Sequence, residues 1–581
     1  MNSIEKLRNL IPIEKRNKWV VFTICLVSLG LDNLNVSGGI TSTISIQEAF
    51  NTTSTNSTWV ISAYALTLGS FILIFGKLSD ILGAHNVFLF GSCIMTLFSL
   101  ICAVIDNSII ALIVFRALQG IGGSALVPSS VGLTAAYFGH DLKLMRLANK
   151  CFLFALTGSF GAGMLIGGGF ALTDLGYKSF FYFSFGLSSV CSIVLFFTII
   201  PVPTHDQTSL KDLNYAGVLV LVGGLLLMIL GLTEGGHKWR QPVAYVTLPI
   251  GFLMVLSVFL FETVYIRRYR IKHANKSPID DQNDSKSIAV SPLKKIESQV
   301  KEVARDNSTS SDSKENETPV DTPAKPESNS DWRLTMNYLF PPECGKIPNF
   351  FVFLFLIIPF YIILTVNLTG LFQYHQFVEH NSSIISALKI FCMPVGIVIG
   401  IFSFRESFVV KFGTKWYMIF CGSLALGSSI WFSRVDFRKE HSFYKYEMVS
   451  LAISGFSVNY YFNVFLNSVM ANTPMHLQGS IAGIYFTAGQ VGVSIGDAIF
   501  TSVVGELSVA VTLEEKEALH KRIINGLYVS VAACAIIFLV SLFTTDTDSI
   551  KAKEKFKEKA NEIAEKSDSD GSNFEDVEKQ I

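Results

Sequence analysis

Long apolar stretches, separated by short polar connections, recur along most of this chain. Each reaches roughly 20 residues, which as an α-helix is enough to cross about 30 Å of hydrocarbon. Because lipid offers the backbone no hydrogen-bond partners, an open-ended spanning segment must be helical. Only 16% of the 581 residues are charged and 50% are hydrophobic, whereas a soluble chain carries about 25% charged residues. The sequence therefore predicts an all-α polytopic membrane protein with fourteen transmembrane helices.

The predicted spans group into two bundles of six helices with an extra pair between them. The spans are 19–41, 59–76, 87–105, 109–130, 151–172, 180–201, 215–233, 243–264, 349–367, 386–403, 416–433, 447–471, 479–505 and 524–544. The predicted regions are an N-terminus (1–18), an N-terminal bundle (19–201), two extra helices (215–264), a disordered loop (267–346), a C-terminal bundle (349–544) and a tail (545–581). The loop is rich in Ser, Asp, Lys, Glu and Pro, a composition that cannot bury enough apolar area to fold.

The basic residues predict the orientation of the chain. Lys and Arg concentrate in short loops that face the cytoplasm, and their distribution here favours a cytoplasmic N-terminus and C-terminus. Three glycosylation sequons, at Asn51, Asn56 and Asn381, then lie in loops on the side of the membrane away from the cytoplasm. We expect an integral protein of the plasma membrane, with the vacuolar membrane as the alternative. The zero net charge gives no indication of a nucleic-acid partner.

The connection between the second and third spans carries Gly76, Lys77, Asp80 and Gly83. We interpret it as a helix-to-helix turn, because glycine permits close or left-handed backbone. Asp80 is expected to face the N-terminus of another helix, where the helix dipole favours negative charge.

Two charged side chains are predicted inside the first half. Asp32 lies in the first span and Arg116 in the fourth, at depths that coincide across a hydrocarbon core of about 30 Å. Such residues rarely face lipid. If the first and fourth helices are neighbours, the two are expected to pair, and the carboxylate could then load and release a proton. The alternative is a static ion pair between helices. The nearby amides Asn35 and Gln119 are assigned to the substrate path.

Further candidates follow along the chain. Asn459, Asn463 and Asn467 share one helical face and predict a polar stripe along a substrate path, with Phe462 on the opposite face; the alternative is hydrogen bonding between helices. Asp497 is a candidate cation site, or else a capping or loop-facing carboxylate. Glycines in the fifth span permit close helix packing; they are Gly158, Gly163, Gly167 and Gly168.

Three of these segments resemble signatures of the major facilitator superfamily of transporters. The stretch from Phe75 to Phe88 resembles its loop 2–3 signature, and Arg116-Ala117-Leu118-Gln119-Gly120 its fourth-helix signature. The glycine-rich fifth span is similar to the antiporter signature, with Met164 where that signature has Pro. With fourteen spans, the chain resembles the fourteen-helix drug:proton antiporters, in the fungal branch of aminotriazole-resistance and boron-export proteins. The resemblance implies proton-driven export by alternating access from a site between two bundles.

Other function classes stay open or are disfavoured. No nucleotide-binding P-loop, catalytic constellation or metal-ligand spacing appears, so we expect no enzyme activity, no metal and no cofactor beyond a proton gradient. The expected partners are a small organic or cationic substrate, protons and lipid, with the protein a monomer. The alternatives are uptake or vacuolar transport of a small metabolite (basic amino acid, ammonium, borate or siderophore), or a transporter-like receptor that signals through the 267–346 loop.

Overall fold

The computed structural model of the chain is helical wherever regular structure is described. The described residues are 11–52, 54–139, 141–202, 210–274, 333, 336–405, 409, 411–469, 473–474, 477–505, 507 and 510–544. The chain divides into two compact units, one of Met1–Phe259 with Asn337–Ile581 and the other of Leu260–Met336. The first unit contains both predicted bundles and is called unit 1 below.

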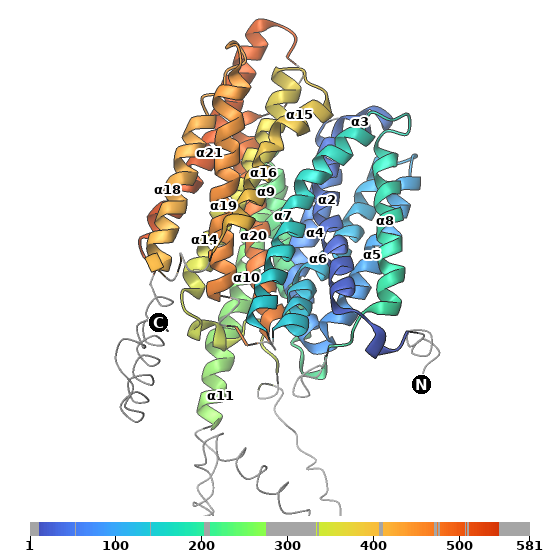
Figure 1. The fold of residues 1–581 in the computed structure, drawn as a ribbon, viewed down its shortest axis with the longest axis vertical. Coiled ribbons are helices and arrows are strands. Elements are labelled where there is room, and N and C mark those ends of the chain that lie inside the picture. Colours follow the sequence, from blue (N-terminus) through green and yellow to red (C-terminus); the bar gives the residue numbers. More distant parts are fainter. Residues whose placement is uncertain are drawn as a thin grey trace, which may run out of the picture. The chain divides into compact units, whose positions relative to one another are not determined.

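Helices of the first half of unit 1 appear in blue to cyan in Figure 1. They are α2 (Lys18–Thr41), α3 (Thr43–Ala49), α4 (Ser54–Leu82), α5 (Ala84–Val104), α6 (Ile109–Phe138), α7 (Leu142–Phe170) and α8 (Tyr177–Thr198). Next come α9 (Tyr215–Lys238) and α10 (Pro242–Leu260). The smaller unit contains a π-helical turn, η3 (Phe261–Ile266), and α11 (Arg267–Ala274).

Helices of the second half lie beside the first half (Figure 1). They are α14 (Phe350–Gln373), α15 (Ser383–Ile390), α16 (Cys392–Ser403), α18 (Thr414–Phe432), α19 (Val449–Val469), α20 (Gln478–Val504) and α21 (Leu513–Ser541). Two π-helical turns belong to them, η5 (Tyr374–Val378) after α14 and η6 (Phe443–Met448) before α19. Short 3-10 turns are η1 (Ile13–Lys15), η2 (Leu210–Asp212) and η4 (Pro342–Lys346).

Every predicted span falls on helical structure. Eleven helices among the described residues are long and apolar enough to cross a membrane. The all-helical membrane fold is therefore confirmed, while the count of fourteen stays a prediction.

Several helices run beyond their apolar stretches because their ends are capped by polar side chains. The Asp141 carboxylate accepts hydrogen bonds from the backbone N–H groups of Lys143 and Leu144, so α7 begins nine residues before the predicted start at 151. Thr512 and Glu515 form a capping box at the start of α21. Such caps satisfy backbone donors that a helix leaves unpaired at its N-terminus.

Two predicted boundaries are wrong. Residues 76–82 do not form a turn but continue α4, and only Gly83, with φ 85°, makes the connection to α5. The predicted loop 267–346 also extends too far, since Leu339 and Cys344 are buried in the core of unit 1. Their apolar side chains pack in spite of the polar composition before them. Residues 275–332 of that loop and the tail from 545 lie outside the described residues.

Close contacts between glycines join the two halves. A Cβ on Gly76 would lie 2.4 Å from the carbonyl oxygen of Gly479, which is closer than packed atoms can approach. Helix α4 of the first half therefore lies directly against α20 of the second.

Candidate functional site

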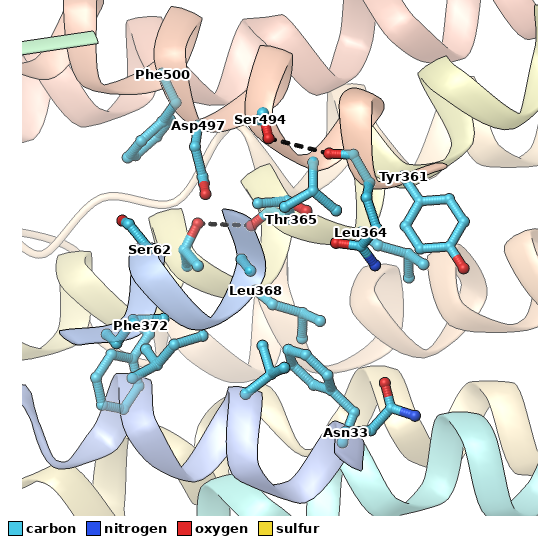
Figure 2. Close-up of a pocket in the computed structure, with 18 of the residues that line it drawn as sticks. Asn33, Ser62, Tyr361, Leu364, Thr365, Leu368, Phe372, Ser494, Asp497 and Phe500 are labelled. Carbon is cyan, nitrogen blue, oxygen red and sulfur yellow. Dashed lines mark hydrogen bonds between the residues drawn. The ribbon is translucent and has the colours of Figure 1, made fainter. Parts of the chain in front are cut away.

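A cavity of about 330 Å³ lies between the two halves of unit 1. Helices α2, α3, α4, α7 and α9 contribute to one side, and α14, α16, α19 and α20 to the other. Figure 2 shows Asn33 and Ser62 from the first half opposite Thr365 and Asp497 from the second. The volume of the cavity lies in the range of about 300–1,000 Å³ that is typical of small-molecule binding sites.

The lining residues place the opening of the cavity at one end of unit 1. Thr43 and Gln47 of α3 line it, as does Gly505 at the end of α20. Helix α4 runs away from α3 to the turn at Gly83, and its last lining residue is Ile72. Beyond Ile72, the α4–α20 contact closes the opposite end.

Asp80 holds this closed end together. Its Oδ1 accepts a hydrogen bond from the backbone N–H of Gly479 at 3.1 Å, and its Oδ2 accepts one from the N–H of Ser480 at 2.9 Å. The Ser480 hydroxyl also donates to Oδ2. Asp80 thus lies at the N-terminus of α20, as expected for a carboxylate that the helix dipole favours. Lys77, one turn earlier, is buried.

Asp32 lines the cavity, but it does not pair with Arg116 as predicted. Its Oδ1 accepts a hydrogen bond from the hydroxyl of Tyr64 on α4. The Arg116 guanidinium lies over the Tyr64 ring, 4.4 Å from its centre. Tyr64 therefore stands between the two charges, and sequence reasoning missed it. The signal was present, because a tyrosine within an apolar span needs a hydrogen-bond partner for its hydroxyl.

Arg116 instead forms a buried polar network with the two predicted amides. It donates to the backbone oxygens of Val60 (3.2 Å) and Asn35 (3.1 Å), and to Gln119 Oε1 at 2.7 Å. Gln119 in turn donates to Ser99 Oγ at 2.7 Å.

Asn35 and Gln119 are both fully buried, and neither is among the described residues that line the cavity. Their assignment to the substrate path is therefore wrong in this conformation. A side-chain amide inside a helix bundle finds its hydrogen-bond partners on neighbouring helices. The hydrogen bonds of these two residues link α2, α5 and α6.

The asparagine stripe on α19 is only partly at the cavity. Asn459 lines it, but Asn463 does not; Asn463 Nδ2 donates to Asn459 Oδ1 at 2.7 Å. Phe462, assigned to the opposite face, lines the cavity instead. The helix is rotated relative to the prediction because its polar amides bond to one another, which leaves an aromatic ring facing the open space. The side chain of Asn467 lies outside the described residues.

Cysteine labelling tests this rotation. In a background without the native cysteines, Asn459→Cys and Phe462→Cys are expected to react rapidly with a small hydrophilic thiol reagent. Asn463→Cys is expected to react much more slowly, because that side chain lies behind Asn459. Rapid labelling at position 463 with none at 462 would contradict the structure.

Asp497 on α20 is the second acidic side chain of the cavity. It is exposed to the open space, and none of the described residues forms a hydrogen bond or an ion pair with it. Figure 2 shows it pointing away from α20 toward Ser62 and Thr365. It lies two turns before the end of α20 at Val504 and so does not cap the helix.

The remaining lining side chains are uncharged. No Lys, Arg or His occurs among the described residues that line the cavity. Its aromatic side chains are Phe160, Phe360, Tyr361, Phe372, Phe377, Phe462, Phe486 and Phe500. Aromatic faces attract cations, so rings and carboxylates together favour a positively charged ligand.

The predicted glycines of α7 act in helix packing and do not line the cavity. A Cβ on Gly163 would meet Ser37 Oγ at 2.2 Å, and one on Gly167 would meet Thr41 Oγ1 at 2.4 Å. These two glycines let α7 approach α2 closely. Gly168 lies near the backbone of Ile384 on α15, whereas Gly158 has ordinary space around it. The buried Met164 leaves α7 a continuous helix at the position of the signature proline.

The three predicted glycosylation sites differ in access. Asn51 and Asn56 are exposed, while Asn381 is half-buried and its Nδ2 donates to Glu379 Oε2 at 2.8 Å. Asn381 therefore has its amide nitrogen engaged within the fold.

Curated relatives match this chain over part of its length. The riboflavin transporter RibZ of Clostridioides difficile is 26% identical over 264 residues, 45% of this chain and 56% of the relative. The low affinity ammonium transporter of Saccharomyces cerevisiae is 31% identical over 229 residues, covering 37% and 43%. The multidrug transporter mdr3 of Aspergillus fumigatus is 29% identical over 208 residues, covering 35% and 39%. The chain thus spans between 39% and 56% of the length of these relatives.

Solved structures share the fold over nearly the whole chain. One solved structure, from a study of substrate recognition in proton dependent oligopeptide transporters, has a TM-score of 0.52 at 12% identity. The match covers 90% of this chain and 98% of the chain in that structure. The human organic anion transporter MFSD10 (TETRAN) has a TM-score of 0.51 at 12% identity, and covers 91% and 100%. At this identity the likeness concerns the fold alone.

The family model described as Major Facilitator Superfamily matches residues 21–271 and 214–496. These matches include the Asp80 connection, the Arg116 network and most of the helices around the cavity. The chain belongs to the Major Facilitator Superfamily.

Proposed function

We propose that this protein is a secondary active transporter that moves small organic cations across a membrane in exchange for protons. The observation that carries the proposal is the cavity between the two halves, which has Asp32 and Asp497 in its wall and no basic side chain among its described lining residues. A cavity closed at the Asp80 end and open at the α3 end is one of the two states that alternating access requires.

Asp32 is the proposed proton site. It is a buried carboxylate on the cavity wall, and buried intramembrane carboxylates mark proton relays. The Tyr64 hydroxyl donates to it and the Arg116 guanidinium lies beyond the Tyr64 ring. This arrangement supports a carboxylate that takes up a proton in one state and releases it in the other.

Asp497 is the proposed cation contact. It has no partner among the described residues and points into the cavity (Figure 2), so a substrate ammonium could pair with it. The size and aromatic wall of the cavity favour an organic cation over ammonium itself, which would leave most of the apolar surface uncovered.

Transport by purified protein in liposomes tests the proposal. With a proton gradient imposed, ethidium is expected to move against the proton flux, whereas a fluorescent organic anion of similar size is not. Methylammonium in the same assay tests the metabolite alternative. If purified protein moved no probe, the receptor alternative would replace the transporter proposal.

Asp497→Asn is expected to raise KM for an organic cation about tenfold, which corresponds to about 1.4 kcal/mol, with little change in kcat. The reason is the loss of one negative charge that faces the substrate. Ser494→Ala is the matched control, because Ser494 lines the cavity one turn earlier and its hydroxyl already donates to the Gln490 backbone oxygen. An unchanged KM in Asp497→Asn would contradict this role.

The membrane and the oligomeric state belong to the same proposal. We place the protein in the plasma membrane as a monomer, with the α3 end outside and both termini in the cytoplasm. Export then follows from exchange for protons that enter the cytoplasm. Microscopy of a tagged copy distinguishes the plasma membrane from the vacuolar membrane.

A further inference from the structure

A buried histidine lies between two carboxylates in the second half, on side chains that do not line the cavity. His375 Nδ1 is 2.8 Å from Glu379 Oε2, and His375 Nε2 is 2.9 Å from Glu447 Oε2. The side chains of His375 and Glu447 are fully buried, and that of Glu379 is 16% exposed. Lys389 of α15 contacts Glu379 at 2.5 Å.

Two residues of this cluster lie on π-helical turns. His375 belongs to η5 and Glu447 to η6, and such turns occur frequently at functional sites. Both oxygens of Glu447 and Nε2 of His375 lack a well-aligned hydrogen bond with any described residue. Since no well-aligned hydrogen bond joins His375 and Glu447, we attribute the short distance between them to attraction between opposite charges.

The charges of this cluster balance only with one additional positive charge. Glu379 and Glu447 contribute −2 and Lys389 contributes +1, which leaves −1 if His375 is neutral. A proton on His375 brings the sum to zero. An unbalanced charge in a buried site is strongly destabilising, so the neutral arrangement is favoured.

Glu379 is not the group that takes up this proton. Burial acts to raise the pKa of Glu379, but the hydrogen bonds and charges of His375 and Lys389 outweigh it and lower that pKa to about 2. Glu379 thus stays ionised and orients the imidazole ring through Nδ1.

A metal ion fits the cluster less well than a proton does. The ligand atoms of His375, Glu379 and Glu447 lie within 4.8 Å of one another. However, the two nitrogens of the ring point in different directions, so the two carboxylates do not converge on one nitrogen. The Lys389 ammonium beside Glu379 would also repel a divalent ion.

The surrounding titratable groups balance one another. They come from η5, α16, α21 and the segment before η6, and are Tyr374, Cys392, Asp436, Arg438, Lys439, Glu517 and His520. Arg438 contacts Asp436 at 3.0 Å and Glu517 at 3.4 Å, and Lys439 lies 3.7 Å from Asp436. His520 is the histidine on α21, with its ring 5.8 Å from that of Tyr374.

We propose that His375, held between Glu379 and Glu447, is a proton-binding site separate from Asp32. The proton on His375 stabilises the contacts between η5, α15 and η6 at the open end of the cavity. The next residues on η5, Gln376 and Phe377, line the cavity, as does Met393, one turn after Lys389. Loss of the proton leaves Glu447 unbalanced and releases this part of the cavity wall. The site exists whether or not the protein exchanges protons for cations.

The pH dependence of thermal unfolding of the purified full-length protein tests this site. Unfolding above pH 6.5 releases the proton, since an exposed histidine does not hold it there. The wild-type Tm should therefore fall as pH rises from 6.5 to 8.5, by about 1 °C per pH unit from this group. His375→Gln should remove that contribution, while the matched control His520→Gln should keep it. A purely structural role for His375 would lower Tm equally at every pH, and that result would overturn the proposal.

A double variant makes the test independent of how well the single variant folds. His375→Gln leaves the cluster at −1, but His375→Gln with Glu447→Gln restores neutrality without a proton. The double variant is expected to unfold at a higher temperature than His375→Gln at every pH, and with the same loss of pH dependence. A double variant less stable than His375→Gln would overturn the charge balance. One transition-metal ion per wild-type chain, absent from His375→Gln, would replace the proton with a metal.

Discussion

Asp32→Asn is expected to reduce proton-driven transport by about 10²-fold or more, the usual effect of removing a group that transfers protons. Asparagine keeps an oxygen that can accept the Tyr64 hydroxyl and has nearly the same volume, so the fold is expected to survive. What it cannot do is bind and release a proton. The measurement is substrate-driven proton flux in liposomes that contain equal amounts of folded protein.

Tyr64→Phe is the control for Asp32. It removes the donor to the carboxylate but leaves the carboxylate itself, so proton flux is expected to persist with a shifted pH profile. If Asp32→Asn carried the same flux as the wild type, the proton site would have to lie elsewhere.

Asp80→Ala is expected to open the closed end of the cavity. The mutation removes the acceptor for the N–H groups of Gly479 and Ser480 and for the Ser480 hydroxyl. Losing a helix N-cap costs about 0.5–2 kcal/mol, which shifts the ratio of the two states about 2- to 30-fold toward opening at this end. Because Asp80 is remote from the cavity, whose lining on α4 stops at Ile72, turnover should change more than substrate affinity.

A buried reporter cysteine measures this opening. Leu73 of α4 is buried, and its backbone lies against Gly483 of α20. Leu73→Cys should therefore react slowly with hydrophilic reagents in the wild type and faster in the Asp80→Ala background. Asp141→Ala is the matched control, since Asp141 caps α7 within one half of the protein. Equal labelling rates in the Asp80→Ala and Asp141→Ala backgrounds would show that Asp80 does not hold the two halves together.

The sequence by itself determined the fold class and most of the helices. Apolar stretches of membrane length leave helix as the only open-ended structure, and each of them lies on a helix. It also placed Asp80 at the start of another helix. A carboxylate is attracted to any helix N-terminus, so this prediction did not require knowing which helix provides it.

Only the tertiary structure decided how polar side chains pair and which face of a helix meets the cavity. Depth along the membrane placed Asp32 and Arg116 at the same level, but the packing of α4 inserted Tyr64 between them. Helical spacing placed Asn459 and Asn463 on one face, but their mutual hydrogen bond turned Phe462 to the cavity. The His375 cluster joins residues far apart in the chain. Periodicity fixes position within one helix, whereas rotation and partners depend on contacts between helices.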